Sequence, residues 1–404
     1  MPELETCLTR GELLEFCRER SESCISMLLP MAKAGTEVRQ NPIQLKNALG
    51  EVKRQLVRRD IPIESIPALN AAEGLLGNEA FWRVQEPGLA VFCCGEECRT
   101  IALPAVDEPF VTTGNAFYCK PLLQMFSQRH YLVLALAQRE ARLFESRPGE
   151  AFGALADLIA PGSIDDILQY VESERQLQHH SLEAAPTKDR HDSFFHGHGG
   201  GGADSDEQRV RLIEYFRAVD EALTPVYERA RTNKAPLIVA CVDYLFPLFR
   251  EVCRYPYLWP NRIVPSGAVS TESKLAELAE RALVEEAARE RSRLRDRIGD
   301  AAPRDFASGD PVLVAHAARE GFVESAIVSP SESLWGAVRD ESGRPVIALT
   351  GDGGDCELTD YIVRMTLLNG GSVVLDEERN DDSIRCAALF RRPVSPEYFG
   401  IEEQ

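Results

Sequence analysis

Two histidines and four consecutive glycines stand close together in the stretch FFHGHGGGGADSDEQ, at residues 194–208. The imidazoles of His196 and His198 titrate near neutrality and can transfer protons. The glycines leave backbone amides uncovered and permit positive φ, so they can hold an anion or the oxyanion of an ester under attack. The candidate residues of the loop beside the two histidines are Phe195, Gly197, Gly199, Gly200, Gly201 and Gly202.

Three other interpretations of this stretch differ in what they require of its neighbours. A surface loop without chemistry fits, because the preceding QLQHHSLEAAPTKDRHDS has no apolar period. A phosphate-binding loop does not fit, since no Gly-Lys-Ser/Thr follows and ADSDE would repel phosphate. A dinucleotide fingerprint does not fit either, because no strand leads directly into the glycines.

No metal ion or cofactor is expected. Zinc needs ligands spaced on a rigid element, and the histidines near the loop lack that spacing. The cluster CCGEEC at residues 93–98 has no second ligand pair, which favours strand packing followed by a turn. No G-x-S-x-G elbow supports a Ser-His-Asp hydrolase. The histidines near the loop are His179, His180, His191, His196 and His198.

The first segment, residues 1–125, predicts an α/β domain. Apolar residues recur at helical spacing, and strand-like runs GLAVFCC and TIALPAV follow. The positions of the longer apolar stripe are Leu45, Leu49, Val52 and Leu56.

The second segment, residues 126–265, predicts a sheet covered by helices. YLVLALAQREARLFE indicates two strands, and PLIVACVDYLF indicates another. Between them lies a helix whose start is signalled by Ser205 and Gln208 as a capping box. The glycine loop is thus expected to project just before a helix N-terminus. The stripe of this helix is Leu212, Phe216, Val219 and Leu223.

The third segment, residues 266–404, follows RYPYLWPNRIVPSG, which is typical of a hinge. A charged helix precedes the cap signal of Asp310 and Pro311, and the next helix ends at Gly321. The strand ESAIV, the helix ELTDYIVRMTLLNGG, the strand SVVLD and the run CAALF complete an alternating α/β domain.

Composition limits the class of protein. Of the 404 residues, 44% are hydrophobic and 27% are charged. No apolar run approaches the length of a membrane span, which is about 18 residues. The chain is therefore expected to be globular, soluble and cytoplasmic. The first twenty residues predict no secretory leader, and the eleven cysteines are expected to be reduced thiols.

The net charge of −19 argues against indiscriminate nucleic-acid binding, and no DNA or membrane partner is expected. Phosphate contacts demand local positive potential. Two basic clusters, VKRQLVRR at 52–59 and RERSRLRDR at 289–297, could supply cations to RNA or could be solvated helix faces.

The order of these motifs resembles the bacterial archaeo-eukaryotic release factor family, and most closely its family 3. SCISMLLPMAKAGTEVRQNPIQLKNAL, FWRVQEPGLAVFCC and KPLLQMF are similar to its N-terminal domain. YLVLALAQREARLFE, SFFHGHGGGG, IEYFRAVDEAL and PLIVACVDYLFPLFREV match in order and spacing. AAREGFVESAIVS, LLNGGSVVLDEE and AALFR resemble the last domain of class-one release factors and Pelota.

The resemblance implies three domains: an N-terminal α/β domain, a ribonuclease-H-like middle domain, and a C-terminal α/β/α domain resembling kink-turn-binding ribosomal proteins. It implies a ribosome-associated translation factor acting in rescue, recycling, hibernation or stress response, with rRNA and tRNA as partners and a GTPase as a further one. The glycine loop would be directed to the peptidyl-transferase region.

One departure from the family pattern bears on activity. True release factors carry Gly-Gly-Gln in this loop, whereas here Ala203 and Asp204 follow the glycines. Two alternatives therefore stay open beside the ribosomal factor. One is a hydrolase of peptidyl-tRNA or another RNA-linked ester that uses His196 or His198, and the other is a non-ribosomal interaction module.

Overall fold

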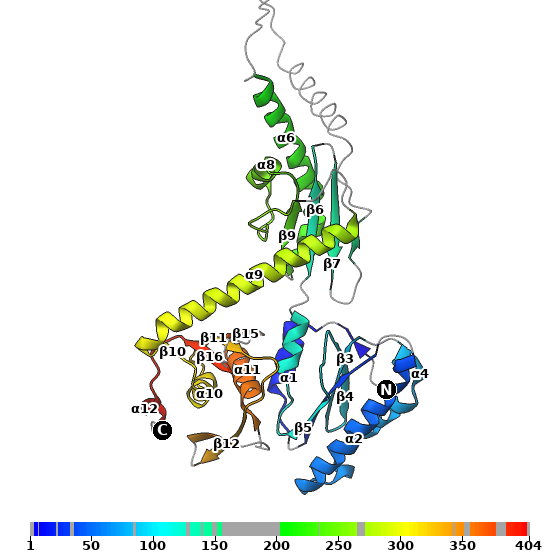
Figure 1. Ribbon diagram of the computed structural model, residues 1–404, viewed down its shortest axis with the longest axis vertical. Helices are drawn as coiled ribbons and strands as arrows, with labels where there is room; N and C mark the ends of the chain where they lie inside the picture. The colour runs from blue at the N-terminus through cyan, green and yellow to red at the C-terminus, as the bar shows by residue number, and fades with distance from the viewer. Residues whose placement is uncertain are drawn as a thin grey trace, which may run out of the picture. The chain divides into compact units, whose positions relative to one another are not determined.

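Two compact units make up the chain in a computed structural model (Figure 1). Unit 1 comprises Met1–Gln128 and Ala287–Gln404, and unit 2 comprises Arg129–Glu286. The predicted mixed α/β class is confirmed. The division at 1–125, 126–265 and 266–404 stays a prediction. The structure describes residues 4–6, 8–21, 23–32, 36–83, 86–126, 130–138, 140–147, 152–155, 203–232, 234–264, 271–341, 344–350, 356–376 and 385–401.

The first sheet of unit 1 has the strand order β1-β4-β3-β2-β5. β2 pairs antiparallel with β3 and β5, and β1 runs parallel to β4. Side chains of a strand alternate between faces, so Ile25 and Met27 enter one core while Cys24 and Leu28 enter another. The strands are β1 (Leu4–Glu5), β2 (Cys24–Pro30), β3 (Gly88–Cys94), β4 (Glu97–Leu103) and β5 (Phe110–Gly114).

Helices cover both faces of this sheet. The predicted stripe of α2 is fully buried against the face that carries Ile25 and Met27. α1 begins at a capping box in which Thr9 and Glu12 satisfy each other's backbone N–H groups. The helices are α1 (Arg10–Arg18), α2 (Asn41–Arg58), α3 (Ala68–Gly74) and α4 (Glu79–Arg83), with 3-10 turns at Thr36–Gln40, Ile63–Ser65, Leu75–Gly77 and Lys120–Phe126.

The C-terminal part of unit 1 contains two further sheets, ordered β10-β16-β11-β15 and β13-β12-β14. The predicted cap at Asp310 is confirmed, since its carboxylate accepts from the N–H of Val312 at 2.9 Å. The elements are β10 (Ala307–Ser308), α10 (Pro311–Arg319), β11 (Val323–Val328), β12 (Trp335–Glu341), β13 (Arg344–Leu349), β14 (Cys356–Glu357), α11 (Leu358–Leu368), β15 (Ser372–Leu375), β16 (Cys386–Phe390) and α12 (Pro396–Phe399), with a 3-10 turn at Ala302–Arg304.

Asp360 joins the two chain segments of unit 1. Its carboxylate accepts hydrogen bonds from the backbone N–H groups of Cys119 and Lys120, both at 2.6 Å. It also pairs with Arg364 one turn further along α11, at 2.8 Å. Asp360 and Arg364 are 3% and 4% exposed, so this ion pair is inaccessible to water.

Lys120 extends the same buried network. Its ammonium donates to the carbonyl of Glu332 at 2.8 Å and to the hydroxyl of Thr359 at 3.0 Å. It lies 3.8 Å from the carboxylate of Glu357, the N-cap residue of α11. Because Lys120 is only 1% exposed, these oxygens replace its hydration shell.

Unit 2 is a three-layer sandwich around the sheet β8-β7-β6-β9. The first half of α9 packs on one face through Leu275, Ala279 and Leu283, and α6, α7 and α8 cover the other (Figure 1). The elements are β6 (Tyr131–Leu136), β7 (Ala141–Ser146), β8 (Gly153–Ala154), α6 (Ala203–Ala222), α7 (Thr224–Thr232), β9 (Leu237–Ala240), α8 (Leu245–Val252) and α9 (Glu272–Ala301), which continues into unit 1.

Two local predictions for unit 2 are wrong. α6 begins at Ala203, so Ser205 lies inside its first turn rather than at its N-cap. The predicted hinge is packed structure over residues 254–264. Tyr255 is buried, and the N–H of Ile263 donates to the carbonyl of Val239 in β9 at 2.9 Å. The prolines of this segment are typical of a linker. The burial of its aromatic side chains and the pairing of its backbone with β9 stabilise a packed structure instead.

Candidate functional site

The site predicted from sequence lies outside the described residues. The roles of Phe195, His196, Gly197, His198 and the four glycines that follow therefore stay predictions. The structure does place the elements on either side of this segment. β8 ends at Ala154, and α6 starts at Ala203, directly after the glycine run.

α6 is firmly held in unit 2. Tyr215, Phe216 and Val219 are at most 1% exposed in the core against the sheet. In the N-terminal half of the helix, the guanidinium of Arg209 donates to the carboxylate of Glu251 in α8 at 3.1 Å. The helix that follows the glycine run in sequence is therefore anchored in the core of unit 2.

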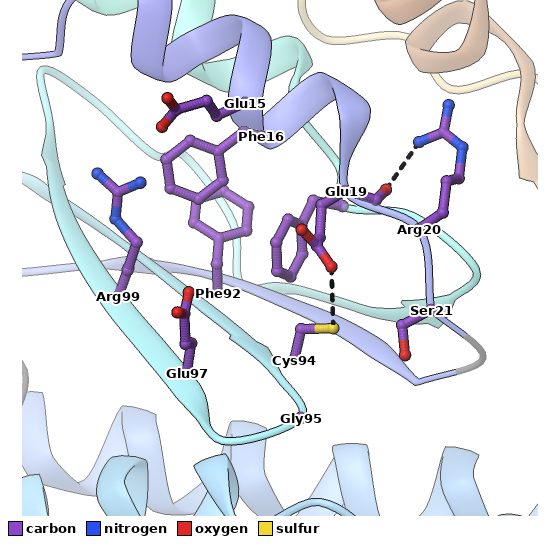
Figure 2. Close-up of a pocket in the computed structure, with 11 residues that line it drawn as sticks. Glu15, Phe16, Glu19, Arg20, Ser21, Phe92, Cys94, Gly95, Glu97 and Arg99 are labelled. Carbon is purple, nitrogen blue, oxygen red and sulfur yellow. Dashed lines mark hydrogen bonds between the residues drawn. The ribbon is translucent and has the colours of Figure 1, made fainter.

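A second candidate site is a cavity of about 540 Å³ in unit 1, between α1 and the β3–β4 hairpin (Figure 2). Its polar residues come from α1, the turn that follows it, and the hairpin. The lining residues are Glu15, Phe16, Glu19, Arg20, Ser21, Phe92, Cys94, Gly95, Glu97, Arg99 and Phe117.

Three phenylalanines form the apolar part of this cavity. The ring centroids of Phe16 and Phe92 are 5.0 Å apart, and Phe117 lies 5.7 Å and 5.3 Å from them. All three side chains are nearly inaccessible to water. Tilted rings at these separations are favourable and rigid, so the cavity has a preformed aromatic base.

Arg99 forms one wall of the cavity. Its guanidinium carbon lies 4.4 Å above the ring of Phe16, and its Nε and Nη2 donate to the carboxylate of Glu5 at 2.8 Å and 2.6 Å. The hydrogen bonds from Arg99 to Glu5 raise the pKa of Arg99. Hydrogen bonds from Thr9 lower the pKa of neighbouring Glu12. Arg99 is therefore a fixed, internally neutralised cation.

On the opposite wall the thiol of Cys94 lies 3.7 Å from the carboxylate of Glu19 (Figure 2). Arg20 turns back to the backbone and donates to the carbonyls of Cys17 and Glu19 at 3.1 Å and 2.8 Å. With Glu15 and Glu97 also in the lining, carboxylates outnumber guanidiniums. The cavity suits a flat or cationic group and disfavours phosphate.

This cavity could not be predicted from the sequence, because its lining residues come from three separate stretches of unit 1. The strand and turn predicted for CCGEEC are confirmed by β3, the turn at Gly95 and β4. Among the described residues, no group of histidine, cysteine and acidic side chains could hold a metal ion. None of the described helices could cross a membrane.

Several cations of both basic clusters form ion pairs with acidic side chains of the same chain. In the first, Lys53 pairs with Glu73 at 2.6 Å. In the second, Arg295 pairs with Asp376 and Arg297 pairs with Glu324 at 2.8 Å. Those guanidiniums already have acidic partners, which favours a solvated helix face over an RNA contact for residues 289–297.

Comparison with known proteins identifies a family for the middle part of the chain. Residues 130–321, which include the glycine run and most of unit 2, match the family model described as bacterial archaeo-eukaryotic release factor family 3. Over these residues the chain matches the family that its motifs predicted. No curated protein matches the chain.

Solved structures of similar proteins include translation factors. Archaeal translation termination factor aRF1 is 14% identical and covers 96% of this chain and 99% of its own, with a TM-score of 0.24. Archaeoglobus fulgidus Pelota is 12% identical over 98% and 95%, with a TM-score of 0.31. S. cerevisiae Dom34 is 10% identical over 76% and 73%, with a TM-score of 0.38. These scores are too low to transfer a mode of action.

Proposed function

We propose that this protein is a cytoplasmic, ribosome-associated translation factor of the release-factor and Pelota-like kind, acting in rescue, recycling, hibernation or stress response. The observation that carries the proposal is the family match over residues 130–321. That match includes the glycine run and the anchored helix α6 that follows it.

In this proposal the glycine loop is the part directed to the peptidyl-transferase region of the ribosome. Uncovered amides of the glycines can hydrogen-bond to hydroxyl and carbonyl oxygens of RNA or to an ester oxyanion. The ribosome with its rRNA and tRNA is the partner, and a GTPase is a further one. Ala203 directly follows Gly202, in place of the glutamine that true release factors carry there. We therefore propose that binding to the ribosome, rather than hydrolysis of peptidyl-tRNA, is the primary activity.

Salt-dependent co-sedimentation with bacterial ribosomes tests this function. Wild type is compared with a variant whose residues 195–203 are replaced by a Ser/Ala linker of equal length. Binding should be saturable, and the replacement should weaken it by about tenfold or more, since Ser and Ala rarely adopt the positive φ that lets glycine amides approach a partner closely. Glu79→Ala serves as a surface control, because its partner Arg83 is 76% exposed at the side chain.

Absence of wild-type binding even at low salt would refute the ribosomal function and favour an interaction module. If wild type binds, peptidyl-tRNA hydrolysis is measured next with His196→Ala and His198→Ala. Turnover that either variant loses while binding is retained would instead support the hydrolase alternative.

A further inference from the structure

Two cysteines face each other across the β3–β4 hairpin of unit 1. The register pairs Cys93 with Cys98, and their sulfur atoms are 2.9 Å apart. Both are free thiols. The separation is less than 1 Å longer than the about 2.05 Å of a disulfide bond, so very little movement separates the two states.

The hairpin geometry explains this approach. Gly95 and Glu96 form a two-residue turn, and Gly95 has φ of 55° at the first turn position, where a type II′ turn needs glycine. The residues that flank such a turn form a hydrogen-bonded pair. The next pair outward, Cys93 and Cys98, is then a non-hydrogen-bonded pair, in which side chains stand closest.

We propose that Cys93 and Cys98 are a peroxide-sensitive thiol pair that closes reversibly to a disulfide. This modification site lies on the face of the sheet opposite the cavity and does not depend on ribosome binding. The reactant that the site takes is a small hydroperoxide, including hydrogen peroxide itself.

The chemistry balances with one peroxide for each pair. The thiolate sulfur of Cys98, which is partly exposed, attacks one peroxide oxygen, and the O–O bond breaks to leave a sulfenic acid and an alcohol or water. The sulfur of Cys93 then attacks the Cys98 sulfur, and the S–O bond breaks. The hydroxyl leaves with the Cys93 proton as water. Two thiols are oxidised, and the peroxide is reduced by two electrons.

The order of attack follows from the surroundings of each thiol. Cys98 is partly exposed, and the hydrogen bond from Cys93 lowers its pKa. Cys93 is buried, and the pKa of its thiol is raised, first by the hydrogen bond to Cys98 and then by burial. Cys98 therefore meets the oxidant, and Cys93 resolves the sulfenic acid.

The neighbouring thiol pair offers a built-in comparison. Cys24 and Cys94 lie on the opposite face of the same sheet, with their sulfur atoms 3.8 Å apart. Burial, with a smaller contribution from Cys94, raises the pKa of Cys24 to about 12. This pair has a longer gap to close and a less reactive thiol, so it should stay reduced where Cys93 and Cys98 oxidise.

Closure would also fix the tip of the hairpin. The carbonyl of Gly95 already accepts from the N–H of Ala68 in α3 at 3.0 Å. Cys94 and Glu97, which line the cavity, lie between the two bridged positions. A disulfide on one face of the sheet would therefore restrict the hairpin residues that line the cavity on the other face.

The test treats the full-length protein with hydrogen peroxide, blocks the remaining thiols, and maps disulfides by mass spectrometry. Glu96 and Glu97 lie between the two cysteines, so a glutamate-specific protease separates them into linked peptides. Wild type should lose two free thiols for each chain at low peroxide excess, form the Cys93–Cys98 link, and recover both thiols with dithiothreitol.

Cys94→Ser is the matched control for Cys93→Ser, because the two positions are adjacent and face opposite sides. Cys94→Ser should form the link at the wild-type rate. Cys93→Ser should form none and should instead accumulate a sulfenic acid at Cys98 that a dimedone-type reagent traps. Mapping in the wild-type protein does not depend on whether the variants fold.

Three results would overturn the proposal. They are a Cys24–Cys94 link that forms first in wild type, oxidation of all described thiols at similar rates, and two intact thiols at Cys93 and Cys98 under about tenfold peroxide excess.

Discussion

Units 1 and 2 both bury carboxylates, but they pair them differently. In unit 2, Asp220 is 1% exposed and accepts from the backbone N–H and the Nε of Arg254, whose side chain is 65% exposed. In unit 1, Asp360 pairs with Arg364, which is itself 4% exposed. The acid is equally hidden in both units, while only in unit 1 is the cation hidden too.

This difference decides what happens when the acid is removed. A cation that already reaches water is solvated when its partner is lost, whereas a buried cation keeps its charge without compensation. The network of Lys120, Glu357, Asp360 and Arg364 also joins segments that are far apart in sequence. The free energy lost when the acid is removed should therefore depend on whether its cationic partner is buried, and not only on whether the acid is buried.

The largest effect is expected from Asp360→Ala. The substitution removes the acceptor of two backbone N–H groups and leaves Arg364 buried and unpaired, so unit 1 should lose about 4 kcal/mol of unfolding free energy. Hydrogen exchange followed by mass spectrometry reads the peptides of each unit separately and should show the loss in unit 1. The exposed pair variant Glu79→Ala should change unit 1 by no more than about 0.5 kcal/mol.

A smaller effect is expected from Asp220→Ala in unit 2. The N–H of Arg254 loses its acceptor, but the guanidinium stays in solvent, so the loss should be about 2 kcal/mol. The same exchange measurement gives this value from peptides of α6 and α8. An Asp220→Ala loss equal to that of Asp360→Ala would contradict the ranking by partner burial.

Much of unit 2 could be predicted from sequence. Its strands β6 and β7 and the stripe of α6 show regular apolar periods, and local patterns report local structure. In unit 1, α2 and β11 could also be predicted from their apolar patterns. The β12–β13 hairpin was not predicted. The start of α6 was misplaced because a capping-box pattern competes with other starts within one turn.

The junction within unit 1 could not be predicted. Lys120 and Asp360 are charged, and charged residues are expected at the surface unless a partner is known. Their partnership spans 240 residues of sequence, with no periodic pattern to report it. The cavity beside Arg99 was missed for the same reason, since its lining is assembled from separate segments. The stretch containing His196 and His198 could be singled out because its unusual composition is local, and its role stays a prediction.

The smallest expected effect is a pH dependence of the stability of unit 1, which comes from the buried histidine His316. His316 in α10 is 5% exposed and stacks on Phe399, with ring centroids 4.9 Å apart. Among the described residues its Nδ1 has no hydrogen-bond partner. Burial, and then the charge of Arg319, lower the pKa of His316 below its ordinary 6.5. His130 in unit 2 instead lies 2.7 Å from Glu145.

Because the folded pKa of His316 is lowered, the unfolded chain binds the proton more tightly. The stability that neutral His316 contributes is therefore present above pH 6.5 and is lost as the pH falls from there toward the folded pKa. Unfolding free energies of unit 1 at about pH 7.5 and about pH 5.5 should differ more in wild type than in His316→Phe, which keeps an aromatic ring against Phe399. An identical pH dependence in the two proteins would contradict the lowered pKa, because it would mean that His316 binds its proton equally well in the folded and the unfolded chain.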